Sequence, residues 1–198
     1  MYRKTKEIKL DEGKFKSEFM FFEEEDRPML KKMFENWVSL SKQSLLVGST
    51  RIINIPEGLT EAIFALDFNC GRSTKSISGT SSSFDHYDFK NDKRIQLKAA
   101  SSYGPSSFGP RSVYDEIYFM FLREIADSKS TKQRNFSGKY EIYKLESSLF
   151  PNIICKKTTG ETFEDQQRQG RRPRFTIPYQ LITPLNLKPI LANDILSW

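Results

Sequence analysis

Two short strands joined by a turn are encoded in residues 83–98, which read Ser83-Phe-Asp-His-Tyr-Asp-Phe-Lys-Asn-Asp-Lys-Arg-Ile-Gln-Leu-Lys98. The polar run Lys90-Asn-Asp-Lys93 predicts the turn between the strands. Side chains of a strand alternate between its two faces, so Gln96 and Lys98 point to the same side. Ile95 and Leu97 then point to the opposite side, into a core. We therefore expect a hairpin with one apolar face and one polar face.

The polar face of this hairpin carries the groups that phosphodiester cleavage needs. Asp85 lies on the first strand, opposite Gln96 and Lys98 on the second. Its carboxylate, the side-chain carbonyl of Gln96 and the main-chain carbonyl of Leu97 are hard oxygen ligands that suit Mg²⁺. Lys98 would orient the attacking water and offset the charge of the phosphate. The pattern resembles the PD-(D/E)xK nuclease motif, with Gln in place of the second acid. It is equally compatible with an exposed hairpin whose polar face carries no chemistry.

Composition narrows the class of protein. The chain has 198 residues, enough for one domain with its own core, and its 16 Phe and 8 Tyr argue against disorder. A net charge of +6 suits a polyanionic partner. One His and two Cys cannot supply a His/Cys zinc site or a disulfide framework, and no phosphate-binding Gly-rich loop is present. With no signal-peptide pattern and no apolar run of membrane-spanning length, we expect a cytoplasmic protein without a membrane partner.

Amphipathic periodicity predicts two helices in the first third of the chain. Residues 26–46 begin with Asp26 as a potential N-cap and carry an apolar stripe. Residues 56–68 place Leu59 and Ile63 inward and Glu61 on the opposite, polar face.

The remainder of the chain predicts strands and loops. Residues 113–121 suit a buried central strand and residues 139–145 alternate like a second strand. We expect loops at 71–82 and 101–111, a flexible connection at 128–137, a short helix at 161–169 and an irregular segment at 175–198. The order of elements predicts an α/β fold of the PD-(D/E)xK type, with a mixed central sheet flanked by helices. We expect a single domain over residues 1–198, with residues 1–25 as a possible N-terminal extension.

A further carboxylate would complete the proposed metal site, because Gln96 is neutral and leaves the site with less negative charge than two acids would. Glu61 is the first candidate, as a catalytic residue and a metal ligand, and Glu57 is the second. The alternative is that both are solvated helix glutamates.

A segment rich in Gln and Arg is the second candidate for function. Arg binds guanine bidentately in the major groove, Gln does the same with adenine, and Arg also pairs with phosphates. Together these side chains suit both base reading and backbone anchoring, although a solvated basic surface has the same composition. The candidate DNA-binding residues of this segment are Gln166, Gln167, Arg168, Gln169, Arg171, Arg172 and Arg174.

Several stretches resemble the Bsp6I family of type II restriction endonucleases. They occur in the family's order over roughly residues 50 to 190, and the long Gln/Arg stretch is the most specific of them. The stretches are Ile55-Pro-Glu-Gly-Leu-Thr-Glu61, Ser82-Ser-Phe-Asp85, Lys93-Arg-Ile-Gln-Leu-Lys98, Ser107-Phe-Gly-Pro110, Tyr114-Asp-Glu-Ile-Tyr-Phe119 and Glu161-Thr-Phe-Glu-Asp-Gln-Gln-Arg-Gln-Gly-Arg-Arg-Pro-Arg-Phe175.

The resemblance implies a prokaryotic nuclease that cuts double-stranded DNA at the site GCNGC with Mg²⁺, alongside a cognate DNA methyltransferase. It implies that Asp85, Gln96 and Lys98 are the catalytic set and that Ser107 and Arg111 join the Gln/Arg stretch in contacting DNA. A homodimer is expected, because a two-fold symmetric protein best reads a two-fold symmetric site. Two alternatives stay open: a repair or structure-specific nuclease of the same fold, and a DNA-binding protein without catalysis.

Overall fold

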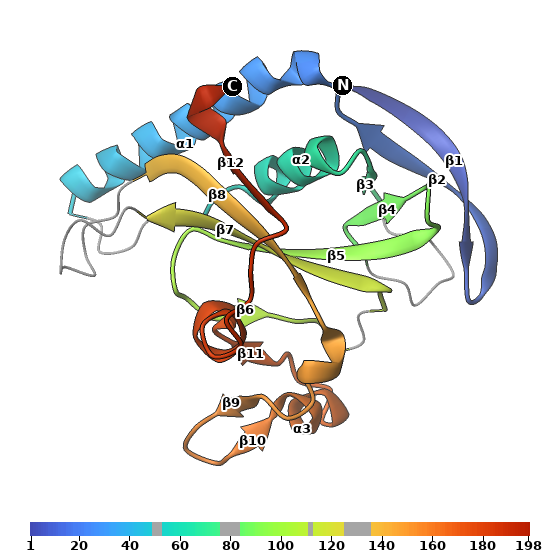
Figure 1. Ribbon diagram of the computed structural model, residues 1–198, viewed down its shortest axis with the longest axis vertical. Coiled ribbons are helices and arrows are strands. Elements are labelled where there is room, and N and C mark those ends of the chain that lie inside the picture. Colours follow the sequence, from blue (N-terminus) through green and yellow to red (C-terminus); the bar gives the residue numbers. More distant parts are fainter. Residues whose placement is uncertain (49–52, 76–83, 111–112, 125–135) are drawn as a thin grey trace.

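The computed structural model describes residues 1–48, 53–75, 84–110, 113–124 and 136–198 and contains an eight-stranded mixed sheet (Figure 1). The strands run in the order β1-β2-β3-β4-β5-β7-β8-β12, and β5 and β7 are the only parallel neighbours among them. The sheet therefore has the mixed character that the order of elements predicts. Its strands are β1 Tyr2–Leu10, β2 Gly13–Phe21, β3 Gly71–Ser73, β4 His86–Asp88, β5 Lys93–Ala100, β7 Glu116–Glu124, β8 Phe136–Leu145 and β12 Leu191–Asp194.

Two helices, α1 (Arg27–Leu46) and α2 (Glu57–Asp67), cover one side of the sheet (Figure 1). The α1 helix buries Leu30, Phe34 and Trp37, whose i, i+4, i+7 spacing forms one apolar stripe. Both predicted helices are confirmed, with ends that shift by one residue. The stripe and the inward side chains of α2 pack on β5, β7 and β8 in one apolar core, which fixes α2 beside the central strands.

The opposite side of the sheet carries a second, smaller layer (Figure 1). Its elements are β6 Ser106–Ser107, β9 Ile154–Lys156, β10 Glu161–Thr162, α3 Phe163–Arg168 and β11 Arg174–Phe175. The β6 strand pairs with β11, and β9 pairs with β10. A second apolar core, rich in phenylalanine, joins this layer to the outer faces of β7 and β8. The short helix expected at 161–169 is confirmed as α3, which ends before Gly170 at a positive φ of 67°.

Within residues 1–25, the segment considered as an N-terminal extension, β1 and β2 are strands of the central sheet. The β1–β2 hairpin joins the sheet through the pairing of β2 with β3. Ile8 and Phe19 of the hairpin are buried with Tyr87 of β4 in a third apolar cluster. Asp26 occupies the N-cap position of α1, but its side chain accepts from the Met1 amino group at 2.6 Å and makes no cap bond.

Three segments expected to be irregular contain strands. The loop expected at 71–82 begins with β3, where a Cβ on Gly71 would lie 2.7 Å from the Phe89 ring. The 101–111 loop contains β6. The irregular segment at 175–198 contributes β12, which extends the sheet beyond β8. Strands of two to four residues lack a detectable alternation, and only their partners stabilise them. The 128–137 connection lies outside the described residues except for its last two, which belong to β8. No helix in the described ranges is long and apolar enough to cross a membrane.

Candidate active site

The predicted hairpin is present, and Asp85 lies where β4 meets β5. The backbone N–H of Asp85 donates to the Ile95 carbonyl at 2.9 Å. Its carboxylate Oδ2 accepts from the backbone N–H of Leu97 at 2.7 Å and from the side-chain amide of Gln96. Asp85 therefore continues the pairing with β5 one step beyond β4, through its backbone N–H and its carboxylate.

Asp85 is largely removed from solvent. Burial raises its pKa to about 6, against the lowering effects of the Leu97 N–H and of Lys98. Gln96 is buried and turns its amide nitrogen, not its carbonyl oxygen, toward the carboxylate. Half a turn of that amide would exchange the two atoms, so Gln96 can offer an oxygen ligand only after rotation.

Glu61 faces this hairpin from α2 and is buried, with 8% of its surface exposed. The expectation of a polar, solvated helix face is therefore wrong for Glu61. Burial first and the charge of Asp85 second raise its pKa to about 7, although Arg72 opposes both. Glu57 lies one turn earlier and is exposed. Both glutamates interact electrostatically with Asp85, and they differ in burial, since Glu61 is buried and Glu57 is exposed.

Two residues of this cluster were missed by the sequence analysis. Arg72 on β3 donates from Nε to Glu61 Oε2 at 2.6 Å. His86, fully buried beside Asp85 in the sequence, has Nε2 at 2.8 Å from the main-chain carbonyl of Glu61. Burial lowers the pKa of His86 to about 4, so the ring is neutral and donates through Nε2–H. Neither has a sequence signal, because Arg72 follows a glycine in a polar stretch and a lone histidine carries no pattern.

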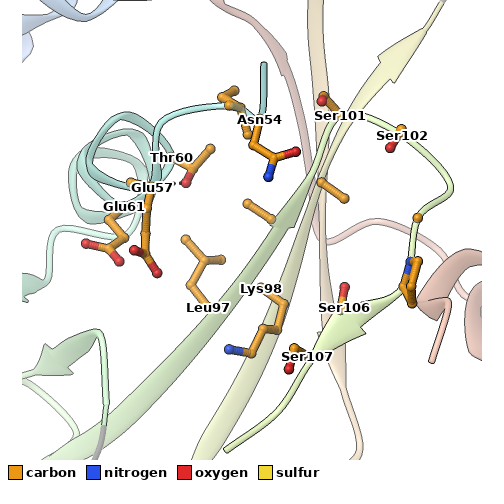
Figure 2. Close-up of a pocket in the computed structure, with 15 residues that line it drawn as sticks. Asn54, Glu57, Thr60, Glu61, Leu97, Lys98, Ser101, Ser102, Ser106 and Ser107 are labelled. Carbon is orange, nitrogen blue, oxygen red and sulfur yellow. Dashed lines mark hydrogen bonds between the residues drawn. The ribbon is translucent and has the colours of Figure 1, made fainter. Parts of the chain in front are cut away.

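A cavity of about 320 Å³ opens beside these residues, between α2, β5 and the 101–107 loop (Figure 2). Glu57 and Glu61 lie on the wall formed by α2, Lys98 and Ser107 on the opposite side, and Leu97 between them. The half-buried Lys98 places Nζ 5.6 Å from the centroid of the Phe108 ring. The cavity thus combines acidic oxygens with one lysine at the end of the hairpin.

The oxygen atoms of this site fit a magnesium ion chemically. In the described ranges no three His, Cys, Asp or Glu side chains gather into a ready-made metal site. Asp85 and Glu61 are two acids, and the remaining donors predicted at this site, the Leu97 carbonyl and Gln96, are neutral. Mg²⁺ takes one or two carboxylates and completes its octahedron with water and phosphate oxygens. Burial is the main cause of the raised pKa of both acids, and a bound divalent cation would favour their ionised forms.

The Gln/Arg segment divides into buried and exposed side chains. Gln166 is buried and donates to Glu161 at 3.4 Å, so in this structure it faces the protein and not a ligand. Arg168 pairs with Glu164 at 2.7 Å and Arg171 pairs with Glu161 at 2.9 Å. Gln167 is half-buried, and the exposed Gln169 accepts from Arg171. Arg172 and Arg174 are exposed and form no ion pair with any residue in the described ranges.

The segment is attached directly to the cavity wall. Arg174 on β11 is the register partner of Ser107 on β6, and Ser107 lines the cavity. The backbone N–H of Phe108 donates to the Pro173 carbonyl at 3.0 Å. Ser107 therefore lies near both candidate sites, whereas Arg111 lies outside the described residues.

The chain is similar to known proteins over most of its length. The profile of a family described as Bsp6I restriction endonuclease matches residues 22–184. The type II restriction enzyme Bsp6I of Bacillus sp. (strain RFL6) is 28% identical over 151 residues, which cover 73% of this chain and 75% of that enzyme. No solved structure gives a significant match. The matched region contains the hairpin, α2 and the Gln/Arg segment, and it excludes the β1–β2 hairpin.

Proposed function

Because the chain belongs to the Bsp6I restriction endonuclease family, we propose that it is a type II restriction endonuclease that hydrolyses phosphodiester bonds of double-stranded DNA with Mg²⁺. The observation that carries the proposal is the position of Asp85, Gln96 and Lys98 on one hairpin, with Glu61 facing it from α2.

Each residue of the candidate active site has a role in this proposal. Asp85, Glu61 and the Leu97 carbonyl would hold Mg²⁺, together with Gln96 once its amide has rotated. A bound magnesium ion would polarise the phosphate and acidify a bound water. Lys98 would bind the scissile phosphate and orient the attacking water, stabilising the charge that grows on the phosphate oxygens. Arg72 would neutralise Glu61 while the metal is absent.

The same proposal covers the DNA and the assembly. Arg172 and Arg174 reach solvent without ion pairs in the described part of the chain and are free to meet phosphates or guanines. The family resemblance favours GCNGC as the target, and a homodimer would match the symmetry of such a site. The sheet runs from β1 to β12, which supports one domain over residues 1–198. We place the enzyme in a prokaryotic cytoplasm, where a cognate methyltransferase would protect the host's own sites.

Digestion of a plasmid that contains GCNGC sites tests the proposal. The wild-type protein with Mg²⁺ should produce discrete fragments. A smear would indicate a nuclease without sequence preference, and an intact plasmid that shifts on a gel would indicate a binding protein without catalysis.

Substitutions at the hairpin test the assigned residues. Asp85→Ala and Lys98→Ala should each lower the cleavage rate by at least about 100-fold, because each removes a group that stabilises the transition state. Binding to cognate duplex in Ca²⁺ should persist. Lys93→Ala, at an exposed lysine of the same strand, is the matched control and should cut normally. Near-normal cleavage by either active-site variant would show that the assignment is wrong.

A further inference from the structure

Phe108 lies between the Gln/Arg segment and Lys98 of β5. It is 2% exposed and follows β6 directly. Its ring stacks on Phe175 with centroids 5.0 Å apart and planes inclined by 2°, and it makes edge contacts with Phe163 at 5.4 Å and Phe150 at 5.5 Å. Such close packing leaves the ring one position relative to its neighbours.

These contacts attach Phe108 to both ends of the Gln/Arg segment. Phe163 is the first residue of α3, at the start of the segment, and Phe175 directly follows Arg174 at its end. The main chain adds the bond from the Phe108 N–H to the Pro173 carbonyl at 3.0 Å. Any displacement of the arginines that moves β11 would therefore move the Phe108 ring.

Phe108 also contacts Lys98. The lysine ammonium lies 5.6 Å from the ring centroid, within the range of a cation–π interaction. Lys98 forms no ion pair within 4 Å with any residue in the described ranges; the charge of Asp85 acts on its ammonium from farther away, and the Phe108 ring contacts it directly. A lysine side chain has four rotatable bonds, and its ammonium stays in one place only when a contact holds it.

We propose that Phe108 is a positioning residue for Lys98, and that through it the Gln/Arg segment controls the alignment of the cleavage site. The inference rests on the proposed function, because it gives Lys98 the phosphate-binding role. Contacts of the arginines with the correct target would fix the positions of β11 and β6, and so hold the Lys98 ammonium over the Phe108 ring. On an incorrect target β11 would not be fixed, and Lys98 would be misaligned. The enzyme would then distinguish the two targets by the rate of cleavage as well as by binding affinity.

The experiment compares Phe108→Leu with Phe150→Leu. Phe150 is the matched control, because it is 2% exposed and packs on Phe108, Phe163 and Phe175, whereas the cation–π contact of Lys98 is with the Phe108 ring. Both variants lose a ring from the same cluster and should lose similar thermal stability. Should Phe108→Leu unfold at the assay temperature, Phe108→Met and Phe150→Met carry the same comparison with a smaller loss of volume.

Cleavage and binding are measured separately. We expect the single-turnover rate of Phe108→Leu on cognate DNA to fall about five- to tenfold below that of Phe150→Leu, the effect of losing one partly buried cation–π contact. The dissociation constants of both variants for cognate duplex in Ca²⁺ should agree within about twofold. The ratio of cleavage rates at cognate and single-mismatch sites should fall for Phe108→Leu alone.

The outcomes separate the two proposals. Equal single-turnover rates for the two variants would overturn the positioning role of Phe108, even though the wild-type enzyme cuts DNA. A fall in cognate binding that matches the fall in rate would overturn it too, because the ring would then act through binding alone. Failure of the wild-type protein to cut, or full activity of Lys98→Ala, would instead refute the proposed function and its active site.

Discussion

Replacing Glu61 by glutamine should stabilise the metal-free protein at high pH while it impairs cleavage. Glu61 is buried, and its pKa is raised from the ordinary 4.5 to about 7. Keeping this carboxylate ionised above pH 7 costs the native state roughly 3 kcal/mol, the free energy equivalent to that change in pKa. Glutamine has the same shape and carries no charge, so the variant avoids this cost.

The attraction of Arg72 does not reduce this gain further. The Arg72 guanidinium bonds Glu61 Oε2 at 2.6 Å, and the pKa of about 7 already includes its lowering effect. The expected net gain at about pH 8.5 is therefore roughly 3 kcal/mol. The native pKa of Glu61 lies above its unfolded value, so ionisation destabilises the protein progressively as pH rises from 4.5 to about 7. Below this window the acid is neutral in both states and the gain disappears.

Urea unfolding with EDTA, followed by tryptophan fluorescence at about pH 5 and about pH 8.5, measures the difference in unfolding free energy. Glu57→Gln is the control: its exposed carboxylate should change stability by less than about 0.5 kcal/mol at both pH values. Addition of Mg²⁺ should stabilise the wild type more than Glu61→Gln, because a ligand of the native state raises stability by mass action.

The unfolding free energy of Glu61→Gln minus that of the wild type should increase from about pH 5 to about pH 8.5. An unchanged difference would refute the raised pKa of Glu61. Cleavage assays test the catalytic role of Glu61 separately. We expect Glu61→Gln to cut much more slowly and to require more Mg²⁺. An unchanged Mg²⁺ titration would remove Glu61 from the metal site and leave Glu57 as the acid to test.

Three further predictions concern other parts of the molecule. Arg172→Ala should weaken DNA binding and flatten its salt dependence by about one unit of slope, as expected for a lost phosphate contact, whereas Arg168→Ala should do less because Glu164 already pairs with that guanidinium. Equal filter-binding curves for the two variants would contradict this difference. Ile8→Ala should lower the unfolding free energy by about 2–4 kcal/mol, because Ile8 is 2% exposed; a loss below about 0.5 kcal/mol in urea would show that the β1–β2 hairpin is dispensable to the fold. His86 has a native pKa of about 4, below its ordinary 6.5. Its neutral ring therefore contributes fully to the unfolding free energy above pH 6.5, and this contribution, about 3 kcal/mol, is lost as pH falls toward 4. The stability difference between wild type and His86→Gln should therefore shrink over this range, and a constant difference would show that His86 does not titrate as proposed.

Local sequence was sufficient where an element depends on its own residues. The hairpin around Asp85 and Gln96 was predicted because a polar turn and a two-residue alternation lie within one contiguous stretch. The two long helices were predicted because an apolar stripe such as that of Leu30 and Phe34 is a property of the helix alone. The oxygen donors and the lysine of the hairpin could be identified in the same way, and their catalytic roles stay predictions.

The tertiary structure decided which polar side chains face one another. On a helical wheel Glu61 lies on the polar face, and only the packing of α2 against the sheet buries Glu61 and brings it within electrostatic reach of Asp85. Arg72 and His86 join the cluster from short strands whose pairing brings together segments distant in the chain. Gln166 turns inward for the same reason, since burial of a polar side chain depends on a partner that local sequence does not specify. Periodicity predicts which face of its own helix or strand a residue lies on. The burial, charge and pKa of a site depend instead on neighbours that only long-range packing brings into contact.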